Sequence, residues 1–301
     1  MKAIVIDQAR RLVWSEVPDP VRQPDEIVID IRAAAVNRAD LMQRAGNYPP
    51  PPGWPAWPGL EVAGTVAEAP PASRWRVGDR VCALLGGGGY AERVALPADM
   101  ALPIPAGLDW NAAAAIPEVW ATATLNLVIE AGMKAGDTVF IQAGAKVVTT
   151  VGTEEKGAFV KTLGADIVVN RKTDAIGPVL EAHPVDIALD CVGGPRMGEH
   201  VAKLAPWGRW IVIAALAGAR TEIDLVALYR QRIRIIGSTL RSRTSAMKAD
   251  ILRRMEAELW EAFAAGTLRS VIYRTLPVTA AADAHAILER NENIGKVVLT
   301  V

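Results

Sequence analysis

Two positively charged side chains stand just beyond predicted strands in the middle of the chain. The strand over residues 146–151 ends at Gly152-Thr153, Lys156 lies one helical turn further on, and Arg171 follows the next strand. A sheet that binds NAD usually ends its second strand with an acidic residue for the ribose 2′-hydroxyl, and none stands at this tip. A cationic pair suits a 2′-phosphate. The pattern therefore favours NADPH over NADH, although two glutamates beside Lys156 add negative charge.

Further candidate binding residues follow the later predicted strands. The carboxyl ends of parallel strands meet at one edge of a sheet, where a doubly wound fold binds its ligand. Backbone groups, more than side chains, are expected to make these contacts. Cys191 follows an apolar strand and is interpreted as a buried, inert thiol. The residues concerned are Cys191, Val192, Ala214, Ala215, Leu240, Arg241 and Ser242.

The elements that must position these residues change character near Asp109. The first third consists of short β-rich runs, with a proline-rich loop at residues 49–59. Asp109 is a suitable N-cap for an alanine-rich helical stretch that Pro117 interrupts. From Asp137 onward, Val- and Ile-rich strands alternate with helical stretches, which predicts a parallel sheet covered on both faces.

The composition excludes several classes of protein. The chain has 301 residues, 33 basic and 33 acidic side chains, a formal net charge of 0 and a hydrophobic content of 51%. This balance argues against a disordered chain and against nucleic-acid binding. No apolar run reaches the roughly 18 residues of a membrane span, and the start of the chain indicates a strand. The 2 cysteines cannot build a disulfide framework. We therefore expect a cytoplasmic protein of about two domains that binds neither membranes nor nucleic acids.

Six short motifs occur in one order along the chain. They are AVNRADLMQRAGNYPPPPG (35–53), PGLEVAGTV (58–66), AAAIPEVWATAT (113–124), LDCVGG (189–194), STLRSR (238–243) and NIGKVVL (293–299). Together they resemble the zinc-independent quinone oxidoreductases of the medium-chain dehydrogenase/reductase superfamily. The resemblance is closest to the branch of the tumour-suppressor-inducible NADPH:quinone oxidoreductase, and it runs along the whole chain with one interruption.

This resemblance implies an α/β fold of two domains. A GroES-like, mostly β catalytic domain is expected from residues 1–118 and 267–301, and a Rossmann domain with a doubly wound parallel sheet from residues 119–266. The resemblance also implies a homodimer, and hydride transfer from NADPH to a quinone or related electrophilic carbonyl compound in the cleft between the domains.

The resemblance assigns roles to individual residues as well. Tyr48 is the first candidate beside both acceptor and cofactor, since a phenol can donate a hydrogen bond to a quinone carbonyl. Asn37 would orient the acceptor or the nicotinamide amide with support from Asp40, although the same residues would also cap a helix. Thr122 stands where the family contacts the nicotinamide end, and Asn293 is placed among the cofactor-binding residues. Solvent is an alternative source of the proton.

No metal site is expected. Asn37 stands where zinc-dependent relatives have a cysteine, and Leu60 stands where they have a histidine. Without thiolate or imidazole ligands, a tetrahedral zinc site has too few donors. His183, His200 and His285 share no motif and are interpreted as structural.

One part of the Rossmann pattern is missing from the sequence. A strand, a glycine-rich turn, a helix and a second strand are expected, but TVFIQAGA (138–145) passes straight into KVVTTVG (146–152). Gly144 and Ala145 are the remaining candidates for phosphate contacts. Adjacent parallel strands need a crossover of a dozen residues or more, so this linker predicts a hairpin or one continuous strand.

Three interpretations of this gap are open. The turn and helix belong to the protein but are missing from this sequence, or they have been deleted and the sheet rearranged, or the strand assignment is wrong. We favour the first, because both flanks match the family. A separation of the Ala145 and Lys146 Cα atoms far above ~3.8 Å would support it.

Two classes of function follow. The first is an NADPH-dependent reductase of quinones or enones, with an alkenal or enoyl reductase as the near alternative. The second is a cofactor-deficient relative with a structural or interaction role, which loss of the phosphate loop would produce. The apolar runs RWIVIAALAG (209–218) and RIRIIGSTL (232–240) favour pairing of two subunits at a sheet edge, unless both are interior strands.

Overall fold

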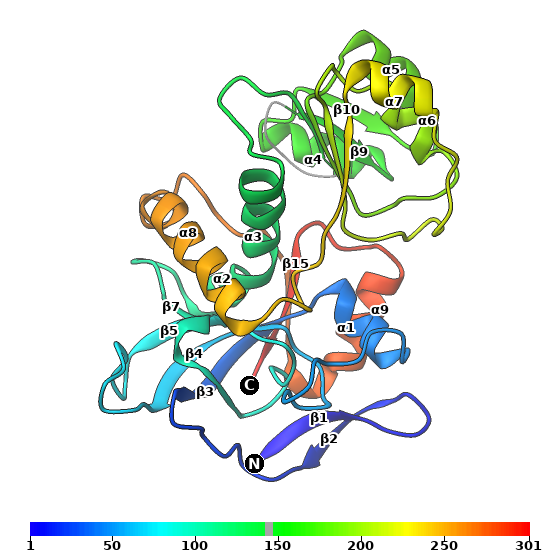
Figure 1. The fold of residues 1–301 in the computed structure, drawn as a ribbon. Coiled ribbons are helices and arrows are strands. Elements are labelled where there is room, and N and C mark those ends of the chain that lie inside the picture. Colours follow the sequence, from blue (N-terminus) through cyan, green and yellow to red (C-terminus); the bar gives the residue numbers. More distant parts are fainter. Residues whose placement is uncertain (142–146) are drawn as a thin grey trace. The chain divides into compact units, whose positions relative to one another are not determined.

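The computed structural model describes residues 1–141 and 147–301 and contains two compact units (Figure 1). The first unit comprises Met1–Thr122 and Leu240–Val301, so both ends of the chain contribute to it. The second unit is Ala123–Thr239. This arrangement, in which the second unit is inserted into the first, agrees with the predicted α/β organisation.

The first unit is built on a mostly antiparallel sheet. In the described residues its order is β14-β15-β3-β4-β5-β7, with β6 also paired to β3. β14 and β15 run parallel, and β15 joins β3 antiparallel, which ties the end of the chain to its beginning (Figure 1). The strands are β3 (Glu26–Ala35), β4 (Glu61–Glu68), β5 (Arg80–Leu84), β6 (Arg93–Pro97), β7 (Ala101–Pro103), β14 (Ile272–Pro277) and β15 (Lys296–Thr300). β1 (Lys2–Ile6) and β2 (Leu12–Glu16) form a separate antiparallel pair.

Two helices of the first unit begin where the sequence predicts. Asp109 caps the first helix of the alanine-rich stretch, because its carboxylate accepts a hydrogen bond of 2.8 Å from the Ala112 N–H. Pro117 begins the next helix, as its fixed φ favours. The helices are α1 (Arg38–Arg44), α2 (Trp110–Ala114), α3 (Pro117–Ala123), α8 (Ser245–Ala264) and α9 (Ala281–Glu289), with 3₁₀ turns η1 (Ala98–Met100) and η3 (Val278–Ala280).

Helix α8 lies in the first unit, whereas the sequence-based boundaries assigned it to the Rossmann domain. The Trp260 indole N–H donates a 2.8 Å hydrogen bond to the Pro103 carbonyl at the end of β7. The Phe263 ring lies between two tryptophans, with centroid distances of 5.0 Å to Trp120 and 5.9 Å to Trp260. The periodic apolar residues of α8 predict a buried face, but they do not say which domain covers it.

The second unit contains a parallel sheet of order β10-β9-β8-β11-β12-β13. This is the strand order of a doubly wound dinucleotide-binding sheet, which confirms the predicted fold class. Its strands are β8 (Val139–Ile141), β9 (Val147–Val151), β10 (Ile167–Asn170), β11 (Ile187–Asp190), β12 (Arg209–Val212) and β13 (Arg234–Gly237). Its helices are α4 (Glu154–Thr162), α5 (Ile176–Ala182), α6 (Met197–Val201) and α7 (Leu225–Gln231), and Thr124–Glu130 form a π-helix, η2.

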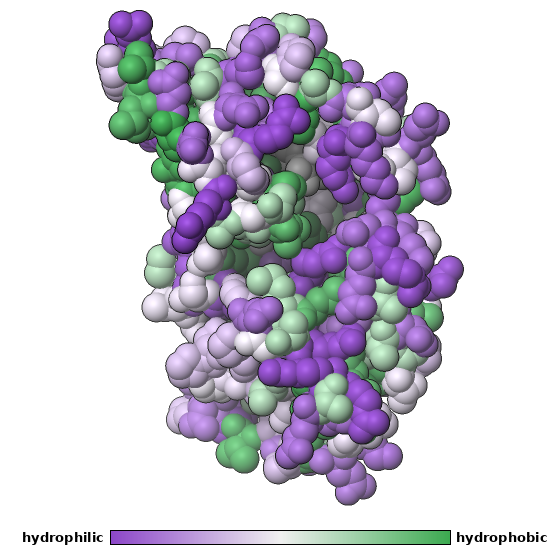
Figure 2. Space-filling model, turned by 90° about the vertical axis from the view of Figure 1, so that its right-hand side faces the viewer, coloured by the Kyte–Doolittle hydropathy of each residue, from purple (hydrophilic) through white to green (hydrophobic). Residues whose placement is uncertain are grey.

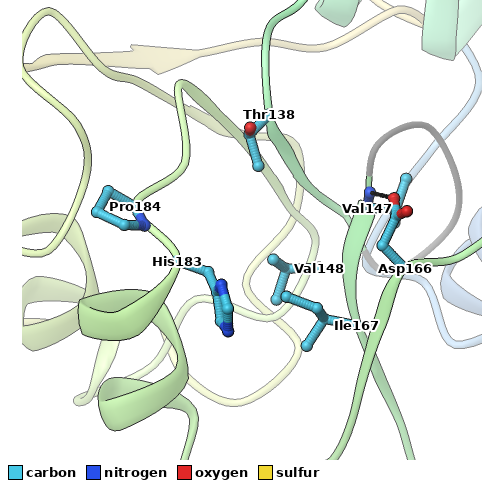
Figure 3. A pocket seen from close by; sticks show the side chains of 7 residues that line it. All are labelled: Thr138, Val147, Val148, Asp166, Ile167, His183 and Pro184. Atoms are coloured by element: carbon cyan, nitrogen blue, oxygen red, sulfur yellow. Dashed lines mark hydrogen bonds between the residues drawn. The ribbon is translucent and has the colours of Figure 1, made fainter.

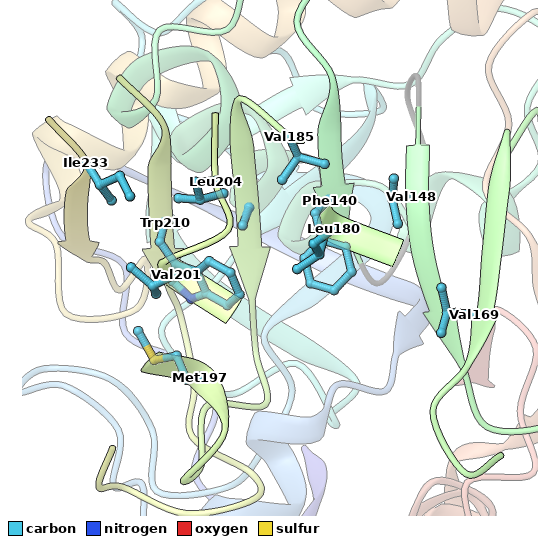
Figure 4. Packing of buried hydrophobic residues seen from close by; sticks show 11 residues of the cluster. Phe140, Val148, Val169, Leu180, Val185, Met197, Val201, Leu204, Trp210 and Ile233 are labelled. Carbon is cyan, nitrogen blue, oxygen red and sulfur yellow. The ribbon is translucent and has the colours of Figure 1, made fainter. Parts of the chain in front are cut away.

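One core of the second unit lies between the sheet and its helices (Figure 4). Trp210 of β12 and Phe140 of β8 pack with ring centroids 6.1 Å apart. Leu180 of α5 and Val201 of α6 cover them. Strands β9, β11 and β12 are therefore largely buried, as the sequence predicts, whereas β13 is mostly exposed.

The connection from β8 to β9 differs from the prediction. The two strands are parallel neighbours, with Val139 opposite Val147 and Phe140 opposite Val148, so the expected hairpin or continuous strand is wrong. β8 has three residues, and the return from its end to the start of β9 is therefore only ~8 Å, within reach of five residues. Residues 142–146 lie outside the described residues, together with Gly144, Ala145 and the Ala145–Lys146 bond.

No helix within residues 1–141 and 147–301 is both long and apolar enough to cross a membrane.

Figure 2 shows a surface on which hydrophilic and hydrophobic residues are interspersed, with apolar residues on the second unit at the upper left of the view. Of the two apolar runs named above, β12 is interior and β13 is an edge strand of the described sheet. Exposed apolar side chains in this unit include Trp207, Leu216, Leu225, Val226, Tyr229 and Ile235.

Candidate functional site

The carboxyl edge of the parallel sheet gathers several predicted binding residues. Cys191 and Val192 follow β11, and Ala214 and Ala215 follow β12. The Ala217 N–H donates a 2.8 Å hydrogen bond to the Val192 carbonyl, so the two loops are paired. Cys191 is half-buried, and the fully buried thiol that the sequence suggests is not found.

Asp190, which the sequence reasoning did not single out, holds the first of these loops. One carboxylate oxygen accepts hydrogen bonds from the N–H groups of Val192 at 2.7 Å and Gly193 at 3.0 Å. The other accepts from the Trp210 indole at 3.0 Å. The acid at the end of β11 thus fixes the backbone that follows it.

Arg171 lies directly against the tip of β9. A Cβ atom on Gly152 would come within 2.8 Å of the Arg171 guanidinium, so glycine leaves room for the guanidinium in this position. The Arg171 N–H donates to the Val151 carbonyl at 2.9 Å. Thr153 caps α4, and its hydroxyl accepts from the Lys156 N–H at 3.3 Å. An exposed guanidinium at the start of a helix is a suitable environment for an anionic group such as a 2′-phosphate.

The side-chain amide of Asn37 forms hydrogen bonds through both its nitrogen and its oxygen within the first unit. Its Nδ2 donates to Glu61 at 2.9 Å, and its Oδ1 accepts from the Lys296 ammonium at 2.6 Å. The residue is 7% exposed. Both polar atoms of the Asn37 side chain are therefore already hydrogen-bonded within the protein.

Asp40 is fully buried. Its carboxylate accepts hydrogen bonds from the N–H groups of Asn37 at 2.8 Å and Gly59 at 2.9 Å and from the Tyr90 hydroxyl at 3.1 Å. Burial raises the pKa of this carboxyl from 3.8 to about 6, against the lowering effect of those hydrogen bonds. Asn37 is the N-cap residue of α1, and Asp40 in the first turn of the helix accepts the hydrogen bond from its N–H. The Tyr90 hydroxyl also lies 3.4 Å from Nε2 of His285.

Glu61 and Lys296 are functional candidates that the sequence reasoning missed. The carboxylate of Glu61 has no exposed surface, and it pairs with the Lys296 ammonium at 2.5 Å. It also accepts from the Glu118 N–H at 2.9 Å, which fixes the start of α3. A signal was present, because each of these charged residues stands within an apolar strand of a recognised motif.

Glu118 is a further residue that the sequence did not single out. Burial raises the pKa of its carboxyl from 4.5 to about 7, with Glu61 and Asp40 acting in the same direction and Lys296 opposing them. The Thr122 hydroxyl donates to Glu118 at 3.3 Å. The predicted nicotinamide contact, Thr122, is therefore next to an acid that titrates near neutral pH.

Tyr48 stacks on Arg241. The guanidinium carbon lies 4.8 Å from the centre of the Tyr48 ring, and one guanidinium nitrogen donates to the Tyr48 carbonyl at 2.8 Å. Burial raises the pKa of the Tyr48 phenol above its ordinary value of 10, so it stays protonated at neutral pH. Arg241 was expected to act through its backbone, but here its side chain makes the contacts.

The remaining predicted residues have smaller roles in the described contacts. Leu240 is buried and Ser242 is exposed. The Asn293 amide donates to the Gly295 carbonyl at 2.8 Å, which shapes the turn before β15. Within the described residues, no group of three or more His, Cys, Asp or Glu could hold a metal ion.

The structure contains one cavity away from the predicted site residues and one that is lined by two residues of the candidate site, Glu118 and Arg241. A cavity of about 130 Å³ in the second unit (Figure 3) lies at the amino ends of β9 and β10, lined in part by Thr138, Val147 and His183. This is the edge opposite to the one where such sheets bind ligands. A smaller cavity lies in the first unit. Its lining residues are Leu60, Leu84, Leu85, Glu118, Leu240, Arg241 and Lys248.

Comparisons with known proteins agree with this architecture. Residues 23–106 match the family described as alcohol dehydrogenase GroES-like domain, and residues 163–299 match the family described as zinc-binding dehydrogenase. The structure of an NAD-dependent alcohol dehydrogenase superposes with a TM-score of 0.85 at 26% identity, covering 100% of both chains.

Two groups of relatives match nearly the whole chain. Quinone oxidoreductase of Lama guanicoe is 30% identical over 309 residues, which are 95% of this chain and 92% of that protein. Squalestatin tetraketide synthase of Phoma sp. (strain C2932) is 29% identical over 317 residues, 92% of this chain, but the chain spans only 11% of that synthase. The chain belongs to the quinone oxidoreductase family of the medium-chain dehydrogenase/reductase superfamily, as its motifs predict.

Proposed function

We propose that this protein is an NADPH-dependent oxidoreductase that reduces a quinone or a related electrophilic carbonyl compound without zinc. The observation that carries the proposal is the Arg171 guanidinium against Gly152 at the tip of β9, in a chain 30% identical to a quinone oxidoreductase. The cofactor supplies the hydride when bound. The second unit is the proposed cofactor-binding domain, and the first unit is the proposed catalytic domain.

In this proposal Arg171 and Lys156 bind the 2′-phosphate at the tip of β9. Backbone groups after β11 and β12 are proposed to contact the rest of the cofactor. Hydrogen bonds hold these two loops in place at the carboxyl edge of the sheet. A glycine at the tip lets the guanidinium lie close to the backbone. NADH lacks the 2′-phosphate, so it would leave Arg171 unpaired.

Tyr48 is the proposed hydrogen-bond donor to the acceptor oxygen. Its phenol is protonated at neutral pH, and the stacked Arg241 guanidinium holds its ring. Asn37 and Asp40 are proposed as positioning residues, since their polar groups already bind Glu61, Lys296 and the backbone. Thr122 and Glu118 form a second polar pair on α3 and are candidates for a water-mediated proton supply.

Zinc independence is part of the proposal, although one matched family is described as zinc-binding. The family resemblance puts Asn37 and Leu60 at the ligand positions of zinc-dependent relatives. In the structure the Asn37 amide binds Glu61 and Lys296, and a cation next to that amide does not suit a metal site. Activity should survive exhaustive treatment with a chelator.

A second candidate is reduction of an alkenal or an enoyl compound. It is supported by the match to fungal proteins that include a highly reducing polyketide synthase, 26% identical over 317 residues. Quinones and enones both place electrophilic carbon next to a carbonyl oxygen, so the same donor would serve either acceptor. NADPH oxidation with a panel of quinones, alkenals and enoyl thioesters separates the two candidates.

A cofactor-deficient protein with a structural or interaction role is the alternative from another class. Its support is the connection of five residues between β8 and β9, too short for a turn and a helix. NADPH fluorescence decides between the classes. The proposal requires a change in fluorescence when the folded 301-residue chain is titrated to near-millimolar cofactor, and an unchanged signal would overturn it.

Location and assembly are finer parts of the same proposal. Cys82 and Cys191 are both free thiols, which suits the reducing cytoplasm. The exposed edge strand β13 is the proposed contact of a homodimer.

A further inference from the structure

Within the described residues, Lys248 is a buried cation without a partner. It stands in the first turn of α8 and is 2% exposed. In the described chain, no hydrogen bond or ion pair reaches its ammonium group. Burial, together with the charge of Arg241, lowers the pKa of Lys248 from 10.5 to about 8. The start of a helix also disfavours a positive charge, so three effects act against this lysine.

Arg241 does not compensate for this charge, because it is a second cation. Its side chain is 7% exposed, and its hydrogen bonds go to uncharged oxygens. These are the carbonyls of Gly86 at 3.0 Å and Tyr48 at 2.8 Å and the amide oxygen of Gln43 at 2.5 Å. Neither Arg241 nor Lys248 forms an ion pair with a carboxylate in the described residues.

Both cations line the small cavity of the first unit. Its other walls are leucines, apart from Glu118, whose raised pKa of about 7 leaves it only partly charged at neutral pH. The space open to the centre of a water molecule is about 10 Å³, enough for a single water. A space of this size admits only a small group, such as one end of a ligand.

We propose that Arg241 and Lys248 form a binding site for a carboxylate carried by the acceptor. The inference rests on the proposed reductase function, in which Tyr48, stacked on Arg241, binds the acceptor. Buried charges are costly unless an opposite charge pairs with them. A carboxylate with its carbon chain between the leucines supplies that charge, so the site selects acidic quinones or enones over neutral ones.

The test uses two acceptors that differ in one charge: a naphthoquinone with a propionate side chain and its methyl ester. Calorimetric titration of the unmodified protein, without cofactor, measures binding separately from turnover. The acid should bind about tenfold to a hundredfold more tightly than the ester. Equal affinities would overturn the inference, even if both compounds are reduced and the proposed function holds.

Substitutions of Lys248 test whether this residue causes the preference for the acid over the ester. Lys248→Met keeps the length and apolar part of the side chain, and it should raise KM for the acid about tenfold or more while leaving KM for the ester nearly unchanged. Lys248→Arg should retain most of the preference. Arg253→Met removes an exposed charge from the same helix and is the matched control. An equal loss with acid and ester in Lys248→Met would show a structural role only.

If neither acceptor is reduced but the acid still binds preferentially, the anion site stands and the proposed reaction fails. The titration and the turnover assay therefore report on the two proposals separately.

Discussion

The ammonium group of Lys296 lies 2.5 Å from the carboxylate of Glu61, which has no exposed surface. Lys296 begins β15 near the end of the chain, and Glu61 begins β4. The Asn37 amide bridges the same two groups, with its oxygen toward Lys296 and its nitrogen toward Glu61. The pair therefore fixes which way the Asn37 amide points.

Lys296→Met should be strongly destabilising, because it leaves the Glu61 carboxylate buried without its cation. We expect the free energy of unfolding to fall by about 3–5 kcal/mol, as measured by urea titration followed by tryptophan fluorescence. Adding Glu61→Gln should recover most of this loss, since the second change removes the unpaired charge. A loss below about 1 kcal/mol in the single variant would place the pair among the weak surface ion pairs.

Because of Asp40, the free energy of unfolding should fall as the pH rises from about 4 to above 6. Its pKa is about 6 in the folded protein and about 3.8 in the unfolded chain, so the folded state binds the extra proton in this range. The stabilisation is complete below pH 3.8 and is lost as the pH passes 6, with a slope of up to about 1.4 kcal/mol per pH unit. Asp40→Asn should flatten the profile of unfolding free energy against pH. An unchanged slope in this variant would assign the dependence to another group.

Tyr48→Phe should lower kcat for quinone reduction by about tenfold to a hundredfold, because the acceptor oxygen loses its hydrogen-bond donor while solvent still supplies a proton. The ring and its stacking on Arg241 remain. Steady-state kinetics with a neutral quinone and a separate measurement of NADPH affinity check this. A weaker affinity for NADPH with an unchanged kcat would show that Tyr48 contacts the cofactor instead.

Arg171→Gln should weaken NADPH binding by about tenfold to a hundredfold and leave NADH binding nearly unchanged, because only NADPH carries the 2′-phosphate. Fluorescence titration with both cofactors measures the two affinities. Lys172→Gln is the matched control, since this neighbouring cation is also exposed. If both cofactors lose affinity equally, Arg171 holds the backbone of the loop and not the phosphate.

Ile235→Glu should convert a dimer into a monomer. Ile235 is exposed on β13, an edge strand of the described sheet, and a charge in the middle of such an edge opposes pairing with a second copy. Light scattering at micromolar concentration gives the mass of both forms. A monomeric unmodified protein would contradict the dimer proposal before any variant is made.

The sequence predicts most of the elements in the second unit and fewer of the contacts in the first. Strands such as β11 and β12 are continuous apolar runs, which are recognisable without any partner. Glu61 and Lys296 are 235 positions apart in the numbering, and no local pattern pairs them. The cations Arg241 and Lys248 also look like ordinary surface residues in the sequence, because exposure is decided by what packs against them.

The sequence by itself determined the family, a parallel sheet covered by helices, and the cationic residues beyond the strands that became β9 and β10. Each of these follows from motifs or periodicities within short segments. Only the tertiary structure decided that α8 joins the first unit, that β8 and β9 lie parallel across a five-residue connection, and that Lys248 is buried. These features depend on contacts between segments far apart in the chain, and burial and charge pairing arise only when those segments meet.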